Sequence, residues 1–129
     1  MTLAEKTKTT LHSWPERQVV FDEDGTRIPD AEVAEIAEGF WGIVSDAFQY
    51  SNDNTDTCPP ERSLMDFVLE KVDDKFTDES KEVAKTKRRR LVREAEMWGA
   101  FVGSPTQTQS LKFFWLEECI EGENPFVAG

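Results

Sequence analysis

The C-terminal third of the sequence brings aromatic side chains and carboxylates close together, a combination that suits the binding of an organic cation. Five aromatic residues precede four glutamates: Trp98, Phe101, Phe113, Phe114 and Trp115, then Glu117, Glu118, Glu121 and Glu123. An ammonium group gains about 0.5–2 kcal/mol over an aromatic face, and carboxylates supply the countercharge. The alternative interpretation is structural, because aromatic residues at helical spacing are usually core residues and glutamates usually face water.

Several other chemistries lack the residues they need. The single histidine, His12, provides neither a histidine-based zinc site nor a pair of general bases. Cys58 and Cys119 are far apart and form no Cys-x-x-Cys motif, so we interpret them as packing residues. The seven glycines contain no Gly-x-Gly, and no Gly-Lys-Ser/Thr is present. The sequence therefore predicts no dinucleotide fingerprint, no P-loop and no metal site.

A second charged feature is a cluster of six cations within nine residues: Lys85, Lys87, Arg88, Arg89, Arg90 and Arg93. The favoured interpretation is a solvated helix face whose charges pair with neighbouring acids, Glu79, Glu82, Glu94 and Glu96. The alternatives are a nuclear address signal or a site for an acidic partner.

Length and charge limit the class of protein. The chain has 129 residues, which suits one domain, and 15 basic against 26 acidic residues give a net charge of -11. Such a charge repels phosphate, so nucleic acid is not expected as a partner. The longest apolar run has four residues, which predicts no membrane span. We predict a cytoplasmic protein with reduced cysteines, with a nuclear location as the alternative suggested by the cluster around Arg89.

The chemistry-bearing residues must be positioned by helices. Hydrophobic spacing predicts helices over residues 30–50, 63–76, 81–102 and 107–120, and β-prone residues around a turn predict a hairpin over 17–28. Ser63 and Asp66 have capping-box spacing, and Gly103 is a helix terminator. We therefore expect an α+β fold that is mostly α-helical, with about four helices and a short N-terminal β-hairpin. Residues 1–13 are expected to form a flexible leader.

Several segments also resemble a known family. They are Glu94-Ala-Glu-Met-Trp-Gly-Ala-Phe101, Ser110-Leu-Lys-Phe-Phe-Trp-Leu-Glu-Glu118 and Gly122-Glu-Asn-Pro-Phe126, together with residues 20–25 and 62–67. In this order and spacing they resemble the middle of fungal flavin-dependent amine oxidases, in the polyamine oxidase branch. The similarity covers about residues 14–129.

The resemblance implies a parent enzyme that oxidises a polyamine by hydride transfer to FAD. That family joins an FAD-binding domain to an inserted substrate domain, and residues 14–129 resemble only part of the insert. Because the dinucleotide fingerprint is missing, we expect FAD to belong to the parent family and not to bind this chain alone. The expected partners are a polyamine-like organic cation and a missing FAD domain.

The resemblance also implies two substrate-binding residues, and we expect no catalytic residue in this chain. Trp98 matches a tryptophan that lines the substrate tunnel, and Asn124 matches a polar tunnel residue near the flavin. Their alternative roles are a core residue for Trp98 and turn chemistry for Asn124. Glu117, Glu118 and Glu121 are weaker candidates, because they have no firm counterpart and are chosen as carboxylates for a polyamine.

Two hypotheses about function follow. In the first, the chain is the substrate-domain portion of an FAD-dependent amine oxidase and is inactive alone. In the second, it is an acidic helical module that binds other proteins through its basic cluster and exposed aromatic residues.

Overall fold

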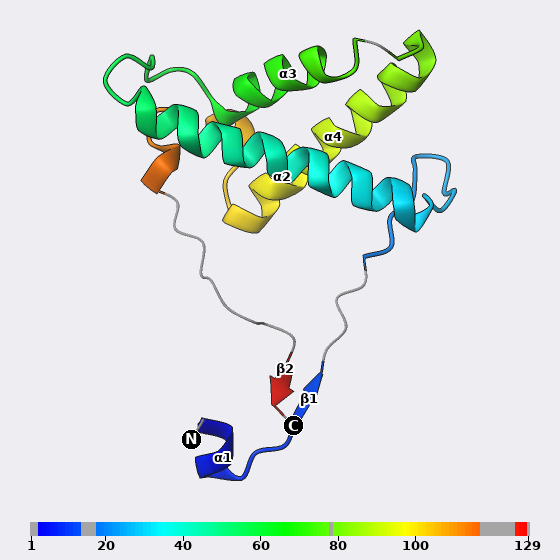
Figure 1. Cartoon of the computed structure of the whole chain (residues 1–129), viewed down its shortest axis with the longest axis vertical. Helices are drawn as coiled ribbons and strands as arrows, with labels where there is room; N and C mark the ends of the chain where they lie inside the picture. Colours follow the sequence, from blue (N-terminus) through cyan, green and yellow to red (C-terminus); the bar gives the residue numbers. More distant parts are fainter. Residues whose placement is uncertain (1–2, 14–17, 78, 117–125, 129) are drawn as a thin grey trace.

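The computed structural model describes residues 3–13, 18–77, 79–116 and 126–128, and it is mostly α-helical (Figure 1). The α-helices are α1 Leu3–Thr7, α2 Asp30–Asp53, α3 Leu64–Lys75 and α4 Lys81–Val102. Two 3-10 turns, η1 Thr106–Thr108 and η2 Phe114–Leu116, follow α4, and the strands are β1 Leu11–Ser13 and β2 Phe126–Ala128. The predicted fold class, mostly helical with a small β element, is confirmed.

The three long helices surround one hydrophobic core. Helix α2 crosses α4, and α3 packs against both (Figure 1). The core positions of α2 recur at three and four residues, so they line one face of the helix. The fully packed core contains these apolar side chains from the three helices and the segment after α4: Phe40, Ile43, Val44, Ala47, Leu64, Met65, Phe67, Val68, Val72, Leu91, Ala95, Trp98, Leu111 and Phe114. The predicted apolar faces of these three helices are therefore confirmed.

Helix α3 begins with the predicted capping box. The hydroxyl of Ser63 accepts a hydrogen bond from the Asp66 N–H at 3.1 Å, and the Asp66 carboxylate accepts one from the Ser63 N–H at 2.9 Å. The Ser63 N–H and hydroxyl together lower the pKa of Asp66. Two backbone donors that the helix itself cannot satisfy are thus bonded at the start of α3.

Removing this cap should destabilise the protein, whereas removing the equivalent serine of α4 should not. Ser63→Ala is expected to lower the free energy of unfolding by about 1 kcal/mol, the usual value for an N-cap hydroxyl. Ser80 occupies the N-cap position of α4 but makes no capping hydrogen bond through its side chain, so Ser80→Ala is the matched control. Urea unfolding of both variants tests this difference, and equal losses would contradict it.

The segment after α4 is not the helix predicted over residues 107–120. Helix α4 ends as predicted at Gly103, whose φ of 84° is left-handed. The following chain then runs beside the start of α3: the Leu64 N–H donates to the Gln109 carbonyl at 2.9 Å, and the Leu111 N–H donates to the Arg62 carbonyl at 3.0 Å. Backbone groups used in this pairing are not free for helical bonds, so only η1 and η2 form within residues 107–116. Residues 117–120 of the predicted helix lie outside the described residues.

The hairpin predicted over residues 17–28 is reduced to a tight loop. An isolated antiparallel bridge joins Phe21 to Arg27, and the Ile28 N–H donates to the Val20 carbonyl at 2.9 Å. The second arm of the loop has no room to extend, because Pro29 follows and α2 begins at Asp30. Residues 14–17 lie outside the described residues.

The small β element is instead formed by two segments far apart in the sequence. Strand β1 pairs antiparallel with β2, with Leu11 opposite Ala128, His12 opposite Val127 and Ser13 opposite Phe126. The whole helical unit lies between these strands in the sequence. Helix α1 and β1 both fall within residues 1–13, the expected flexible leader.

Candidate functional site

A groove opens on the described surface between the 18–28 loop, α2 and α4. Its volume is about 540 Å³. The walls are mainly apolar and come from all three segments: Val20, Phe21, Ile28, Val33, Ile36, Ala37, Met97 and Ala100. Phe21 and Met97 are 61% and 60% exposed, so the groove opens to solvent. Three arginines and four acidic residues also line the groove, so apolar walls and charged groups meet in one hollow, as in many binding sites.

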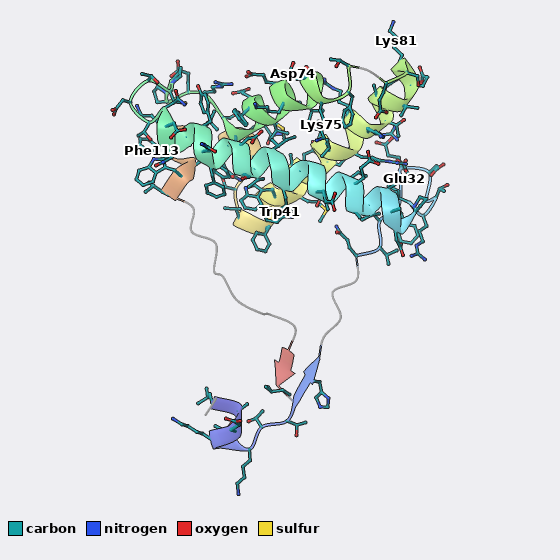
Figure 2. All side chains as sticks on the ribbon, in the orientation of Figure 1. Glu32, Trp41, Asp74, Lys75, Lys81 and Phe113 are labelled. Atoms are coloured by element: carbon teal, nitrogen blue, oxygen red, sulfur yellow. The ribbon has the colours of Figure 1, made fainter. Side chains whose placement is uncertain are left out.

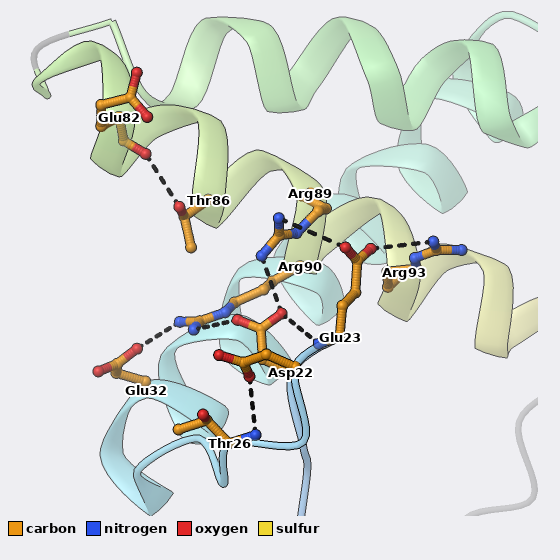
Figure 3. A network of polar contacts seen from close by, with 10 residues as sticks. Asp22, Glu23, Thr26, Glu32, Glu82, Thr86, Arg89, Arg90 and Arg93 are labelled. Atoms are coloured by element: carbon orange, nitrogen blue, oxygen red, sulfur yellow. Dashed lines mark hydrogen bonds and ion pairs between the residues drawn. The ribbon is translucent and has the colours of Figure 1, made fainter.

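The loop wall of the groove is held to α4 by ion pairs (Figure 3). The Asp22 carboxylate accepts hydrogen bonds from Arg89 at 2.9 Å and from Arg90 at 2.9 Å. Arg90 also bonds Glu32 of α2 at 2.5 Å, so one guanidinium joins the loop to two helices. Asp22 and Arg90 are each only 19% exposed, which makes their contact less screened than an ordinary surface pair.

Most cations of the basic cluster are therefore bound in ion pairs within the chain and do not form a free positive surface. Two of the four neighbouring acids expected to neutralise the cluster do so: Glu79 pairs with Lys87 and Glu96 pairs with Arg93, at 2.8 Å each. Other partners come from distant parts of the chain: Asp22, Glu23, Glu32, Glu35 and Asp73. Hydrogen bonds first to Glu35 and then to Glu79 raise the pKa of Lys87 to about 12.

Neutralising Asp22 should destabilise the fold in a pH-dependent way. Its hydrogen bond from Arg90, followed by that from the Glu23 N–H, lowers the pKa of Asp22. A lowered carboxylate pKa stabilises the folded state above the ordinary pKa, and this contribution disappears as the pH falls through the lowered value. Asp22→Asn should therefore unfold at lower urea than the wild type near pH 6, and this difference should shrink at about pH 3.

The matched control for this prediction is Asp56→Asn, which removes the same charge from an exposed loop position. The control should leave the urea midpoint close to that of the wild type at both pH values. A difference for Asp22→Asn that is unchanged between the two pH values would contradict an electrostatic role for Asp22.

Among the described residues, Glu94 is the charged residue of the groove whose side chain has no ion-pair or hydrogen-bond partner. It projects from α4 between Arg90 and Met97, two residues that also line the groove. No ion pair or hydrogen bond joins its carboxylate to another of the described residues, although the nearby arginines all have acidic partners. Burial raises the pKa of Glu94 because no cation offsets the lost hydration.

Trp98, the first of the predicted substrate-binding residues, lies in the core. It is 8% exposed, and its ring contacts Phe40, Trp41, Phe101 and Phe114, with centroids 5.8–6.3 Å apart. The indole N–H donates to the Gln109 side-chain oxygen at 3.0 Å. Trp98 is thus a buried residue that packs against the exposed rings of Trp41 and Phe101.

The other predicted site residues, Asn124, Glu117, Glu118 and Glu121, lie outside the described residues. Of the aromatic residues in the proposed cation site, Phe114 is buried, whereas Phe101, Phe113 and Trp115 are exposed. Cys58 is buried and free, and Cys119 lies outside the described residues.

Sequence reasoning missed the groove and the role of Asp22. Asp22 and Glu23 were interpreted as turn residues, and nothing local links them to arginines almost 70 positions away. A usable signal was the excess of cations in one stretch of α4, which requires acids from elsewhere in the fold. Ala37 and Met97, on facing helices, had no such signal.

The starts of α2 and α3 do not form the kind of phosphate site that FAD would need. The start of α3 is filled by its own capping box, and a proline precedes α2, so neither helix offers free N–H groups in a glycine-rich turn. The groove is lined by Asp22, Glu23, Glu94 and Glu96 and also by Arg89, Arg90 and Arg93, whose guanidinium groups already bond carboxylates of the chain. Among the described residues, no group of three or more His, Cys, Asp or Glu side chains is placed to hold a metal ion. None of the described helices combines the length and apolar character needed to cross a bilayer.

The fold and the groove define a small, mostly helical acidic protein with an open apolar binding surface. Comparisons with models of protein families, with curated proteins and with solved structures found no match.

Proposed function

We propose that residues 14–129 form the substrate-domain portion of an FAD-dependent amine oxidase and have no oxidase activity alone. The observation that carries the proposal is the pairing of β1 with β2. A domain inserted into a host chain leaves and re-enters it at neighbouring points, and two paired strands on either side of the helical unit meet that requirement. The segments that resemble the polyamine oxidase branch lie between these strands or end on β2.

In this role the chain binds the amine, and a separate FAD domain accepts the hydride. We expect that separate domain to hold the flavin, so the chain contributes binding and orientation only. Exposed aromatic residues such as Phe101, Phe113 and Trp115 supply faces for a cation or for the host domain. Glu117, Glu118 and Glu121 are the proposed countercharges.

Spermine binding measured by calorimetry tests this proposal. We expect a colourless protein that releases no peroxide with spermine but binds it. The double variant Glu117→Gln/Glu118→Gln should weaken binding about 10-fold, a loss of about 1.4 kcal/mol. The control Asp56→Asn/Glu61→Gln removes the same charge from an exposed loop and should change affinity less than about twofold.

Three results would contradict the proposal. Bound flavin, or peroxide release with spermine, would show that the chain is more than a substrate domain. Equal weakening in the two double variants would show only general attraction to an acidic protein. An absence of spermine binding would favour the second function.

That second candidate is an acidic helical module that binds other proteins. The specific observation in its favour is the groove, because its walls expose apolar side chains that a finished monomer usually covers.

A further inference from the structure

The apolar surface of the groove continues beyond its walls along both helices. Phe101 lies one helical turn beyond Met97 on α4, and Trp41 lies one turn beyond Ala37 on α2, so each pair shares a helix face. Phe101 is 86% exposed and Trp41 is 54% exposed. Figure 2 shows Trp41 projecting outward from α2. Such a surface is longer than a compact small molecule covers, and it suits an extended or helical segment of a partner.

Among the described residues that line the groove, the charged side chain without a partner is Glu94, and its charge is negative. The guanidinium groups of Arg89, Arg90 and Arg93 all bond carboxylates of the chain itself. Glu94 is half-buried and has no cation among the described residues, so its carboxylate has lost hydration without compensation. A positive group that enters the groove would supply the cation that the Glu94 carboxylate lacks.

We propose that the groove binds a basic amphipathic segment of a partner protein, with an apolar side chain between α2 and α4 and a Lys or Arg at Glu94. This inference rests on the second candidate function and specifies its partner. A second copy of the chain is disfavoured, because each copy carries a net charge of -11 and two such copies repel each other.

A set of model peptides tests the proposal. The probe is a fluorescein-labelled helical peptide of Leu and Lys, and its binding to the full chain is measured by fluorescence polarisation at physiological salt. One comparison peptide replaces each Lys with Glu, and another replaces each Leu with Ser. We expect the Leu/Lys peptide to bind at least about 10-fold more tightly than either comparison peptide, because the groove needs both the apolar side chain and the cation.

Matched variants locate the binding. Met97→Ser and Glu94→Gln should each weaken binding of the Leu/Lys peptide about 5- to 10-fold. The controls are Val83→Ser, an exposed apolar position elsewhere on α4, and Glu61→Gln, an exposed acid outside the groove. Both controls should stay within about twofold of the wild type. Circular dichroism confirms that each variant is folded.

Several outcomes would overturn the inference. Equal binding of the Ser/Lys peptide would show attraction to net charge alone, and unchanged binding by Met97→Ser would place the contact elsewhere. If the Leu/Glu peptide bound as tightly as the Leu/Lys peptide, and Met97→Ser weakened that binding, the role of Glu94 would be overturned. The chain would still be an interaction module. Binding of no peptide by the folded chain would reject the proposed occupant. Light scattering that reveals a dimer lost in Met97→Ser would assign the groove to a second copy.

Discussion

Replacing Leu111 with alanine should lower the free energy of unfolding by about 2–5 kcal/mol, the usual cost of truncating a fully buried leucine. The Leu111 side chain is completely buried in the core shared by α2, α3 and α4. Its backbone is tied to the start of α3 by a 3.0 Å hydrogen bond to the Arg62 carbonyl, so the segment is poorly able to close the cavity. Urea unfolding followed by tryptophan fluorescence measures the loss.

Leu116→Ala is the control for this variant. Leu116 lies in the same segment but is 58% exposed, so its truncation should change the free energy of unfolding by less than about 0.5 kcal/mol. Similar losses for Leu111→Ala and Leu116→Ala would contradict the path of the chain after α4.

Replacing Gly99 with alanine should destabilise the protein, although alanine is the better helix former. A Cβ at position 99 would stand 3.0 Å from the Ser104 carbonyl oxygen and 3.0 Å from the Thr106 nitrogen. These are backbone atoms of the turn after α4, and Thr106 is anchored there by a 2.5 Å hydrogen bond from its hydroxyl to the Ala95 carbonyl. Over-packing costs about 1–3 kcal/mol and should outweigh the helix-propensity gain of about 1 kcal/mol.

The control for Gly99 is Gly42, another helical glycine. No atom lies within 4 Å of a Cβ built at Gly42, so Gly42→Ala should gain stability, by about 0.5–1 kcal/mol. Thermal unfolding of the two variants should therefore shift the midpoint in opposite directions. A higher midpoint for Gly99→Ala would contradict the close approach of the turn to α4.

Helix ends were predictable because their signals are local. The capping box depends on Ser63 and Asp66, three positions apart, and the end of α4 depends on the left-handed conformation of Gly103. The core faces of α2, α3 and α4 follow from apolar spacing, which each segment carries by itself.

The segment after α4 shows where this reasoning fails. Leu111 and Phe114 have helix-like spacing, and both are indeed buried, but residues 109–111 pair with residues 62–64 instead of forming helical bonds. Apolar spacing reports which side chains are buried and not which backbone groups bond to one another. Leu111 and Phe114 are therefore buried as their spacing predicts, whereas Trp115 of the same predicted face is 41% exposed and the predicted helix is wrong.

The candidate site was predicted even less completely. The sequence identified the cations of α4 and two of their partners, but the acids that hold the loop, Asp22 and Glu23, lie almost 70 positions from the arginines they bind. Glu94 was counted among the neutralising acids, yet it has no partner among the described residues. Its distinct role appears only when the arginines are seen bonded elsewhere.

The sequence by itself determined the three long helices and their apolar faces, since caps and hydrophobic period are carried by residues a few positions apart. It also determined the acidic balance of the chain, which is a sum over all its charged residues. The tertiary structure alone decided that the 18–28 loop lies on α4, that a groove opens between α2 and α4, and that one carboxylate in that groove has no partner among the described residues. These features depend on distances between side chains far apart in the chain, and such distances exist only once the helices have packed.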